Sequence, residues 1–200
     1  DPISQARFAA PQSNPDSLDL TRWTADQVTR LVTDVYAAVA IIRPDIVMSA
    51  AVYPDPNTAP TAQHQDAKAW AARGGLDLIV PMLYSTGGAG STWDARLQNW
   101  LGGASGRLVV AGHITSQGIS SLLDQINLTR TRGAAGNSVF SYTSFLWWDT
   151  YATGVYQQLA VVPAMPWKTS PTAGIIYGYV TDPNGAPIVD TQVWRAGATY

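Results

Sequence analysis

The sequence feature that most constrains the fold is an apolar, strand-like run that recurs four times at nearly constant spacing. The runs begin at Ile46, Asp77, Leu108 and Ser138, so successive starts lie 31, 31 and 30 residues apart. A strand, a helix and two loops occupy roughly 30 residues in a βα unit. The runs are apolar on both faces, as in parallel strands that helices cover. The spacing therefore predicts an α/β fold, either a barrel or a doubly wound sheet. The predicted strands, adjacent and parallel in this order, are 46–53, 78–84, 108–113 and 138–144.

Helical patterns fill the stretches between these runs, and most of them end at glycine, a common helix stop. The first helix is predicted to begin at Thr24, where Thr24 and Gln27 form a capping-box pattern, and to stop before Pro44. Residues 1–23 contain three prolines and no clean period, which predicts a loop. The later predicted helices are 62–73, 92–101, 119–132 and 150–159.

The last part of the chain has a different character. Pro163, Pro166 and Pro171 predict a linker over 163–172. Strand residues then alternate around Asp182-Pro-Asn-Gly185, a strong hairpin-turn signal. Residues 173–200 therefore read as the start of a second, small β module.

Composition excludes several functions. The net charge of −2 leaves no basic patch for nucleic acid, and no apolar run approaches the ~20 residues of a membrane span. Cysteine is absent, which rules out disulfides and thiol catalysis. The two histidines have no acid cluster nearby, so we predict neither a metal site nor a cofactor. All 14 acidic residues are Asp, while eight Trp and nine Tyr offer rings on which sugars stack, although most of these rings should be core.

Several motifs resemble one family, the bacterial glycosyl-hydrolase-like family 10 barrels, over about residues 1–147. They are Pro2-Ile-Ser-Gln-Ala-Arg-Phe8, Trp23 with Asp26-Gln-Val-Thr-Arg-Leu31, Arg43-Pro-Asp45, Val47-Met-Ser-Ala-Ala51, Asp77-Leu-Ile-Val-Pro-Met-Leu-Tyr84, Val110-Ala-Gly112 and Val139-Phe-Ser-Tyr142. The tail, Ile176-Tyr-Gly-Tyr-Val-Thr-Asp182 with Gly185-Ala-Pro-Ile188, resembles the opening of carboxypeptidase-regulatory-like, immunoglobulin-like domains.

The resemblance implies the C-terminal half of a (β/α)8 TIM-type barrel over 1–162, the linker 163–172, and a partial β-sandwich module over 173–200. It also implies a secreted or cell-surface bacterial protein whose partner is a glycan or polysaccharide. The chain opens without Met and reads as a mature or excised piece. The family's acidic strand motif falls upstream of Asp1, so no family acid can be assigned to a residue of this chain. We therefore expect the fragment alone to be inactive, and whether the protein is an enzyme stays open.

Barrel sites form at the carboxyl ends of the strands, which selects the candidate residues. The candidate catalytic acids are Asp55, which could equally serve a turn, and Asp149, which could equally cap a helix. His113, Tyr84 and Tyr142 end three successive strands, and Trp147 follows the last. We expect these four side chains to contact substrate, against the alternative that they are core or solvated. Asp77 starts its strand and belongs to the opposite, stabilising face.

Two functions remain. The first is a carbohydrate-active, glycoside-hydrolase-like protein that acts on or binds a glycan. The second is a non-catalytic extracellular surface or assembly protein that pairs with another copy, or exchanges strands, through open sheet edges.

Overall fold

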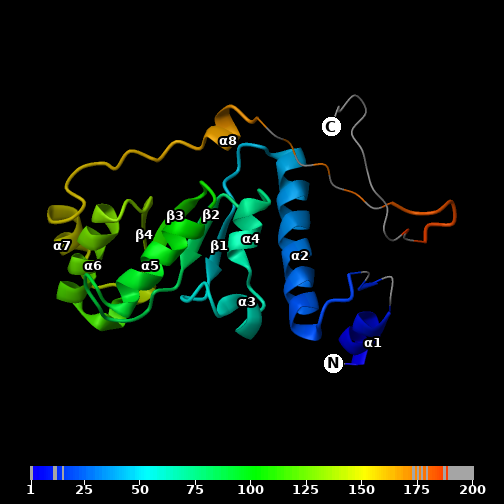
Figure 1. The fold of residues 1–200 in the computed structure, drawn as a ribbon. Helices are drawn as coiled ribbons and strands as arrows, with labels where there is room; N and C mark the ends of the chain where they lie inside the picture. Colours follow the sequence, from blue (N-terminus) through cyan, green and yellow to red (C-terminus); the bar gives the residue numbers. More distant parts are fainter. Residues whose placement is uncertain are drawn as a thin grey trace.

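A computed structural model of the chain describes residues 2–10, 13–14, 16–172, 174, 176, 178, 180–186 and 188. Its centre is one four-stranded parallel sheet in the order β1-β2-β3-β4 (Figure 1). The strands are β1 (Ser49–Val52), β2 (Leu78–Pro81), β3 (Leu108–Ile114) and β4 (Gly136–Phe140). Each strand pairs in parallel with the next, which confirms the predicted order and direction. This arrangement is compatible with part of a TIM barrel.

Helices run between the strands. They are α1 (Pro2–Ala9), α2 (Leu20–Ile42), α3 (Ala59–Ala62), α4 (Ala67–Ala72), α5 (Thr92–Gly103), α6 (Ile119–Thr131), α7 (Trp148–Thr153) and α8 (Pro166–Thr169), with short 3-10 turns η2 (Thr115–Gln117) and η3 (Tyr142–Ser144). Within the part of the chain that is described, no helix combines the length and apolarity that crossing a membrane requires.

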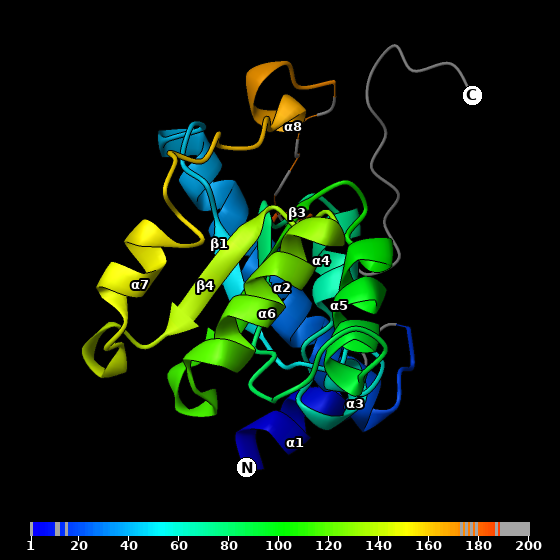
Figure 2. The ribbon, with the colours of Figure 1, turned by 90° about the vertical axis from the view of Figure 1, so that its left-hand side faces the viewer.

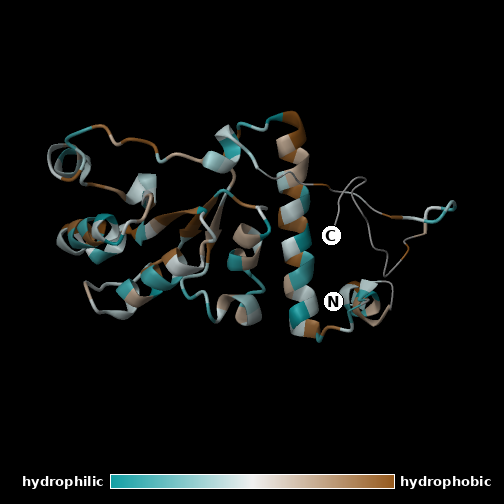
Figure 3. Cartoon of the chain, turned by 45° about the horizontal axis from the view of Figure 1, so that its top comes forward, coloured by the Kyte–Doolittle hydropathy of each residue, from teal (hydrophilic) through white to brown (hydrophobic). Residues whose placement is uncertain are grey.

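One face of the sheet is covered and holds the main core. Figures 1 and 2 show α4, α5 and α6 on the same side of the strands, and Val28 and Val32 of α2 pack against the same core. The buried cluster joins Val52, Ile79 and Val109 of the strands to tryptophans of the helices. The opposite face is more open, with Ala51, Ser138 and Phe140 exposed. In Figure 3 hydrophobic colour marks the strands and also the carboxyl end of α2, where Ile41 and Ile42 are exposed.

The predicted start of the chain was wrong in two respects. Residues 2–9 form α1 rather than a loop, and α2 begins at Leu20 rather than after Thr24. The reason for the early start is Asp19, whose carboxylate accepts a hydrogen bond from Arg22 N and caps the helix. Thr24 lies inside the first turns, where its hydroxyl donates to Leu20 O, so it does not form the predicted capping box.

Two later helices also differ from the prediction. The helix expected over 62–73 is divided into α3 and α4, because the backbone at His64 has a left-handed φ of 57° and Asp66 then caps α4. The helix expected over 150–159 is shorter and begins earlier, as α7. Helices α5 and α6 begin where predicted.

The proline-rich segment 163–172 is packed against the sheet domain. Trp167 of α8 donates its indole N–H to Asp77 Oδ1 at 2.7 Å, and Lys168 Nζ lies 3.0 Å from Asp77 Oδ2. Tyr36 Oη and Met48 N also donate to this carboxylate. Burial alone would raise the pKa of Asp77, but these hydrogen bonds outweigh it and hold the pKa below its ordinary value. Asp77 therefore joins α2, β1 and α8 at the amino end of β2.

Most of 173–200 lies outside the described residues, so the predicted immunoglobulin-like module is not shown. The predicted turn at Asp182–Gly185 is described, and it closes with hydrogen bonds from Asp182 N to Ala186 O and from Ile188 N to Val180 O. These bonds agree with a hairpin turn at this place.

We predict that Asp77→Ala destabilises the protein strongly. The change leaves the Lys168 ammonium without its buried partner and removes an acceptor that four donors share, for an expected loss of about 3–5 kcal/mol in unfolding free energy. Urea denaturation at pH 7 measures it. The matched control is Asp45→Ala, which breaks the Arg43–Asp45 ion pair of similar length on the surface and should change stability little. Equal effects of the two substitutions would contradict the account.

Candidate functional site

The carboxyl ends of β2 and β4 carry a row of exposed aromatic side chains, here called the aromatic rim: Tyr84, Phe140, Tyr142 and Trp148. Tyr84 and Phe140 stack with ring centroids 5.9 Å apart, and Tyr142 lies 5.2 Å from Trp148. All four are substantially exposed, with Tyr142 at 79% and Phe140 at 61%. Exposed rings that contact one another, unlike single exposed side chains, are typical of binding surfaces, which makes this rim the candidate site.

Alternation along β4 sets the direction of these rings. Val139 turns to the helix-covered side and packs on the cluster of Leu122 and Ile126. Its neighbour Phe140 therefore turns to the open side, where it stacks on Tyr84, which follows β2 on the other side of β3. The sequence analysis did not select Phe140, although the same alternation was a signal that could have found it. Trp148 was also missed among the contact residues.

Hydroxyl side chains at 141, 143 and 144 are close in sequence to Phe140 and Tyr142. Thr115 Oγ1 and Ser144 Oγ are 3.0 Å apart, and Ser141 is within hydrogen-bond distance of Thr143 and Ser144. Such groups donate and accept in the manner of sugar hydroxyls. The rim thus combines apolar ring faces with small polar groups.

His113 occupies a buried position behind this rim. Its side chain is fully buried and stacks on Trp93 at 5.8 Å. Nδ1 lies 3.1 Å from Gln125 Oε1 and Nε2 lies 2.7 Å from Asn137 Oδ1. Burial lowers the pKa of His113, which keeps the ring neutral at pH 7. The structure gives His113 a supporting position, and direct contact with substrate stays a prediction.

Gln125 connects this histidine to the loop after β2. Its amide nitrogen donates to Ser85 O at 2.8 Å and Gly87 O at 3.2 Å. The Gln125 side chain is fully buried, so these hydrogen bonds satisfy polar groups that water cannot reach. His113 and Gln125 therefore form one hydrogen-bonded chain that fixes the loop after β2.

Asp94 holds the other side of the same loop. The carboxylate is almost fully buried, accepts from Gly90 N at 2.8 Å and pairs with Arg132 at 2.6 Å. The Arg132 guanidinium lowers the pKa of Asp94 to about 2, against the opposing effect of burial. The sequence analysis did not identify Asp94, because nothing local reveals a partner 38 residues away.

The other predicted residues are dispersed. Asp55 accepts from Asn57 N in a turn and lies 3.8 Å from Arg96, so its carboxylate is engaged locally. Asp149 is exposed in the first turn of α7, whose N-cap is Trp147. Trp147 is half-buried against Phe145. Tyr84 contacts Phe140 and Tyr142 contacts Trp148, whereas the partners of Asp55 are Asn57 and Arg96. That these residues form one site stays a prediction.

No cluster that could hold a metal ion, meaning three or more His, Cys, Asp or Glu side chains, occurs among the described residues.

Comparison with protein families decides the relationship. Residues 4–103, half of the chain, match the glycosyl hydrolase-like 10 family. The chain belongs to this family. No curated protein matches it. The matched region of this glycosyl hydrolase-like protein runs from α1 through α5 and includes Tyr84, Asp55 and Asp94, whereas His113 and the rest of the aromatic rim follow it.

We predict that acid unfolds this glycosyl hydrolase-like protein partly through Asp94. Its folded pKa is depressed, so its contribution is present above the ordinary carboxyl pKa near 4 and is lost as pH falls toward 2. Asp94→Asn should lower stability at pH 7 and flatten the pH dependence between 4 and 2. Urea midpoints measured from pH 6 to 2 test this. Arg132→Met should reproduce the effect, and an unchanged slope in Asp94→Asn would refute it.

Proposed function

We propose that this glycosyl hydrolase-like protein binds a glycan at its aromatic rim. The observation that carries the proposal is the pair of exposed ring contacts, Tyr84 with Phe140 and Tyr142 with Trp148, at the carboxyl ends of the strands. Sugar rings present C–H faces that pack on aromatic faces, and their hydroxyls hydrogen-bond to groups such as those of Ser141 and Thr143. In (β/α) barrels this is the end of the sheet at which sites form.

The partner that we propose is a bacterial polysaccharide or a fragment of one. The protein would meet this glycan outside the cell, as a secreted or cell-surface protein. The family supports action on glycans, and the lack of cysteine and the light charge are compatible with an extracellular protein. The hydroxyls and ring faces of the rim, with Asp149 as the acid nearest in sequence, favour a glycan without a high negative charge density.

We assign binding rather than hydrolysis to this chain alone. Glycoside hydrolysis ordinarily uses two carboxylates that flank the scissile bond, roughly 5–10 Å apart. Asp55 is engaged with Asn57 and Arg96, which leaves Asp149, beside Trp148, as the carboxylate nearest in sequence to the rim. A single carboxylate supports recognition of hydroxyl groups but lacks the second group of the usual pair. In the proposal, this chain is one half of a (β/α)8 barrel.

Substitutions in the rim test the proposal. Tyr142→Ala and Trp148→Ala should each weaken polysaccharide binding about 2- to 12-fold, corresponding to ~0.5–1.5 kcal/mol per lost ring contact. Affinity electrophoresis on gels cast with bacterial polysaccharides measures the change. Leu146→Ala is the matched control, because Leu146 is exposed in the same segment but has no ring. If a glycan retards Tyr142→Ala and Trp148→Ala as much as it retards Leu146→Ala and the wild type, the aromatic rim is not the binding site.

A second function, assembly through the sheet, is supported by the edges of the described sheet. β1 and β4 are its outer strands, and the open face exposes Ala51 and Phe140. Unpaired edges favour pairing with another chain. Sedimentation equilibrium separates the two functions: a stable dimer that dissociates on Ala51→Lys would favour assembly, whereas a monomer that binds polysaccharide favours the glycan function.

A further inference from the structure

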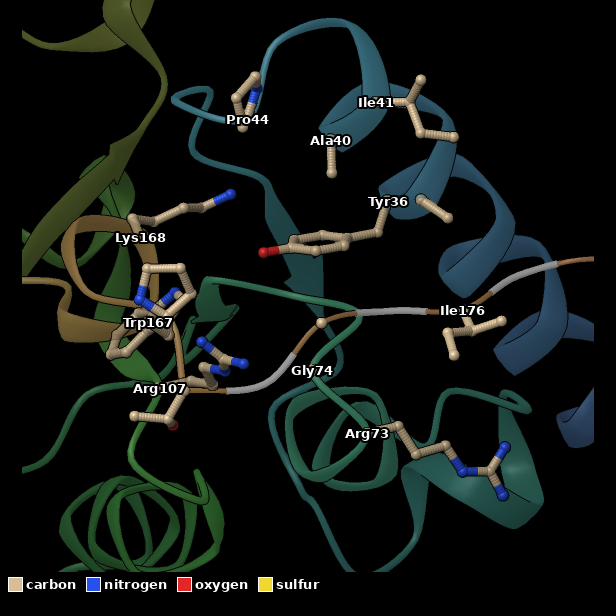
Figure 4. Close-up of a pocket in the computed structure, with 14 residues that line it drawn as sticks. Tyr36, Ala40, Ile41, Pro44, Arg73, Gly74, Arg107, Trp167, Lys168 and Ile176 are labelled. Carbon is tan, nitrogen blue, oxygen red and sulfur yellow. The ribbon is translucent and has the colours of Figure 1, made fainter. Parts of the chain in front are cut away.

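A hollow lies at the opposite end of the sheet from the aromatic rim. It has a volume of about 780 Å³ and lies between the carboxyl half of α2, the residues that precede β2 and β3, and the segment around α8. Its walls include Ala40 and Ile41 on one side and Arg107 with Trp167 on the other (Figure 4), and Ala37 also lines it. Small-molecule sites typically occupy ~300–1,000 Å³, so the hollow is large enough for one.

Three cations line the hollow, and two of them already have partners. Lys168 is 3.0 Å from the Asp77 carboxylate and donates to Ile46 O. Arg73 is 3.9 Å from Asp26, and Figure 4 shows its guanidinium extending away from the other labelled residues. Lys168 and Arg73 therefore each already have a carboxylate partner.

Arg107 is the exception among these three. No carboxylate of the described residues lies within ion-pair distance of it. Its Nη1 is shielded from solvent and has no hydrogen-bond partner. Its guanidinium lies 4.4 Å above the Trp167 ring, and Figure 4 shows it directed between Trp167 and Gly74. A partly desolvated cation without a counter-charge gains free energy when an anion comes beside it.

The walls restrict what the anion can be. A cation lies over one face of each ring that lines the hollow: Arg107 lies over Trp167, and the Lys168 ammonium lies 4.7 Å from the centre of the Tyr36 ring. Positive charge at both rings favours an anion over a neutral sugar. The remaining apolar wall is aliphatic, with Ile41 81% exposed. One uncompensated cation matches a singly charged group better than a dianion such as phosphate.

We propose that this hollow binds an aliphatic carboxylate. The carboxylate pairs with the Arg107 guanidinium, whose planar fork suits two oxygens, and the hydrocarbon chain lies along Ala37, Ala40 and Ile41. The site is separate from the glycan rim and does not depend on it. Because α8 supplies Trp167 and Lys168, ligand binding also fastens the 163–172 segment to the sheet domain.

Titration of the full chain with a series of straight-chain carboxylates tests the proposal. Acetate, butyrate, hexanoate and octanoate are added at constant ionic strength, with hexanol, octanol, sulfate and phosphate as comparison ligands. The indole N–H resonance of Trp167, assigned by its loss in Trp167→Phe, reports the site. Affinity should rise several-fold with each pair of added methylenes. The alcohols, sulfate and phosphate should bind at least tenfold more weakly than octanoate.

Two arginine variants locate the charge. Arg107→Met keeps an aliphatic side chain beside Trp167 but removes the cation, and it should weaken octanoate binding at least tenfold. Arg73→Met is the matched control and should change binding less than twofold. Arg107→Lys keeps the charge without the fork and should show an intermediate loss, which serves as the test if Arg107→Met does not fold.

Several results would overturn the proposal. They are octanoate binding that survives in a folded Arg107 variant, sulfate or octanol that binds as tightly as octanoate, and a Trp167 resonance that stays fixed while other resonances shift. None of these outcomes bears on glycan binding at the opposite end of the sheet.

Discussion

The burial of three tryptophans between the helices and the sheet is the constraint on which the rest of this structure depends. Trp70, Trp93 and Trp100 are each no more than 3% exposed and form the centre of the main core. Each also needs an acceptor for its indole N–H, because an unpaired donor in this core would cost on the order of 1–3 kcal/mol. The acceptors are Thr29 Oγ1, Leu83 O and Pro54 O, in that order. The two carbonyl acceptors, Pro54 O and Leu83 O, follow β1 and β2, so packing of the core also fixes the loops at the carboxyl ends of these strands.

Much of the fold was predictable because it depends on local pattern and on period. The strand order and direction follow from βα units of nearly equal length, and the glycines at 74 and 133, with φ of 75° and 80°, mark helix ends as expected. The start of α2 was not predictable from its capping pattern, because Asp19 and Thr24 both offer an N-cap and the choice depends on packing. The packing of Trp23 explains the choice. Its side chain is 5% exposed and its indole N–H donates to Ser13 O, so Trp23 is fixed in the first turn and the helix begins before it.

The side chains of the candidate site follow only partly from the sequence. Parallel strands bring their carboxyl ends to one edge, so Tyr84 and Tyr142 were reachable from sequence. His113 was harder to interpret, since its partners Gln125 and Asn137 come from α6 and β4. The alternation of β3 contained the necessary signal, because His113 shares its face with the buried Val109 and Ala111. Asp94 and Arg107 depend on contacts between distant segments, which no local pattern encodes.

The two ends of the sheet have different chemistry, and glycan binding is proposed for the carboxyl end. The most direct measurement is a map of amide and aromatic resonances during titration with oligosaccharides released from bacterial polysaccharides. The account predicts saturable shifts at Tyr84, Phe140, Tyr142 and Trp148, with smaller shifts at His113 behind them. Shifts confined to Tyr36, Arg107 and Trp167 would contradict glycan binding at the aromatic rim. The absence of shifts at the rim with every oligosaccharide that binds the protein would contradict it as well.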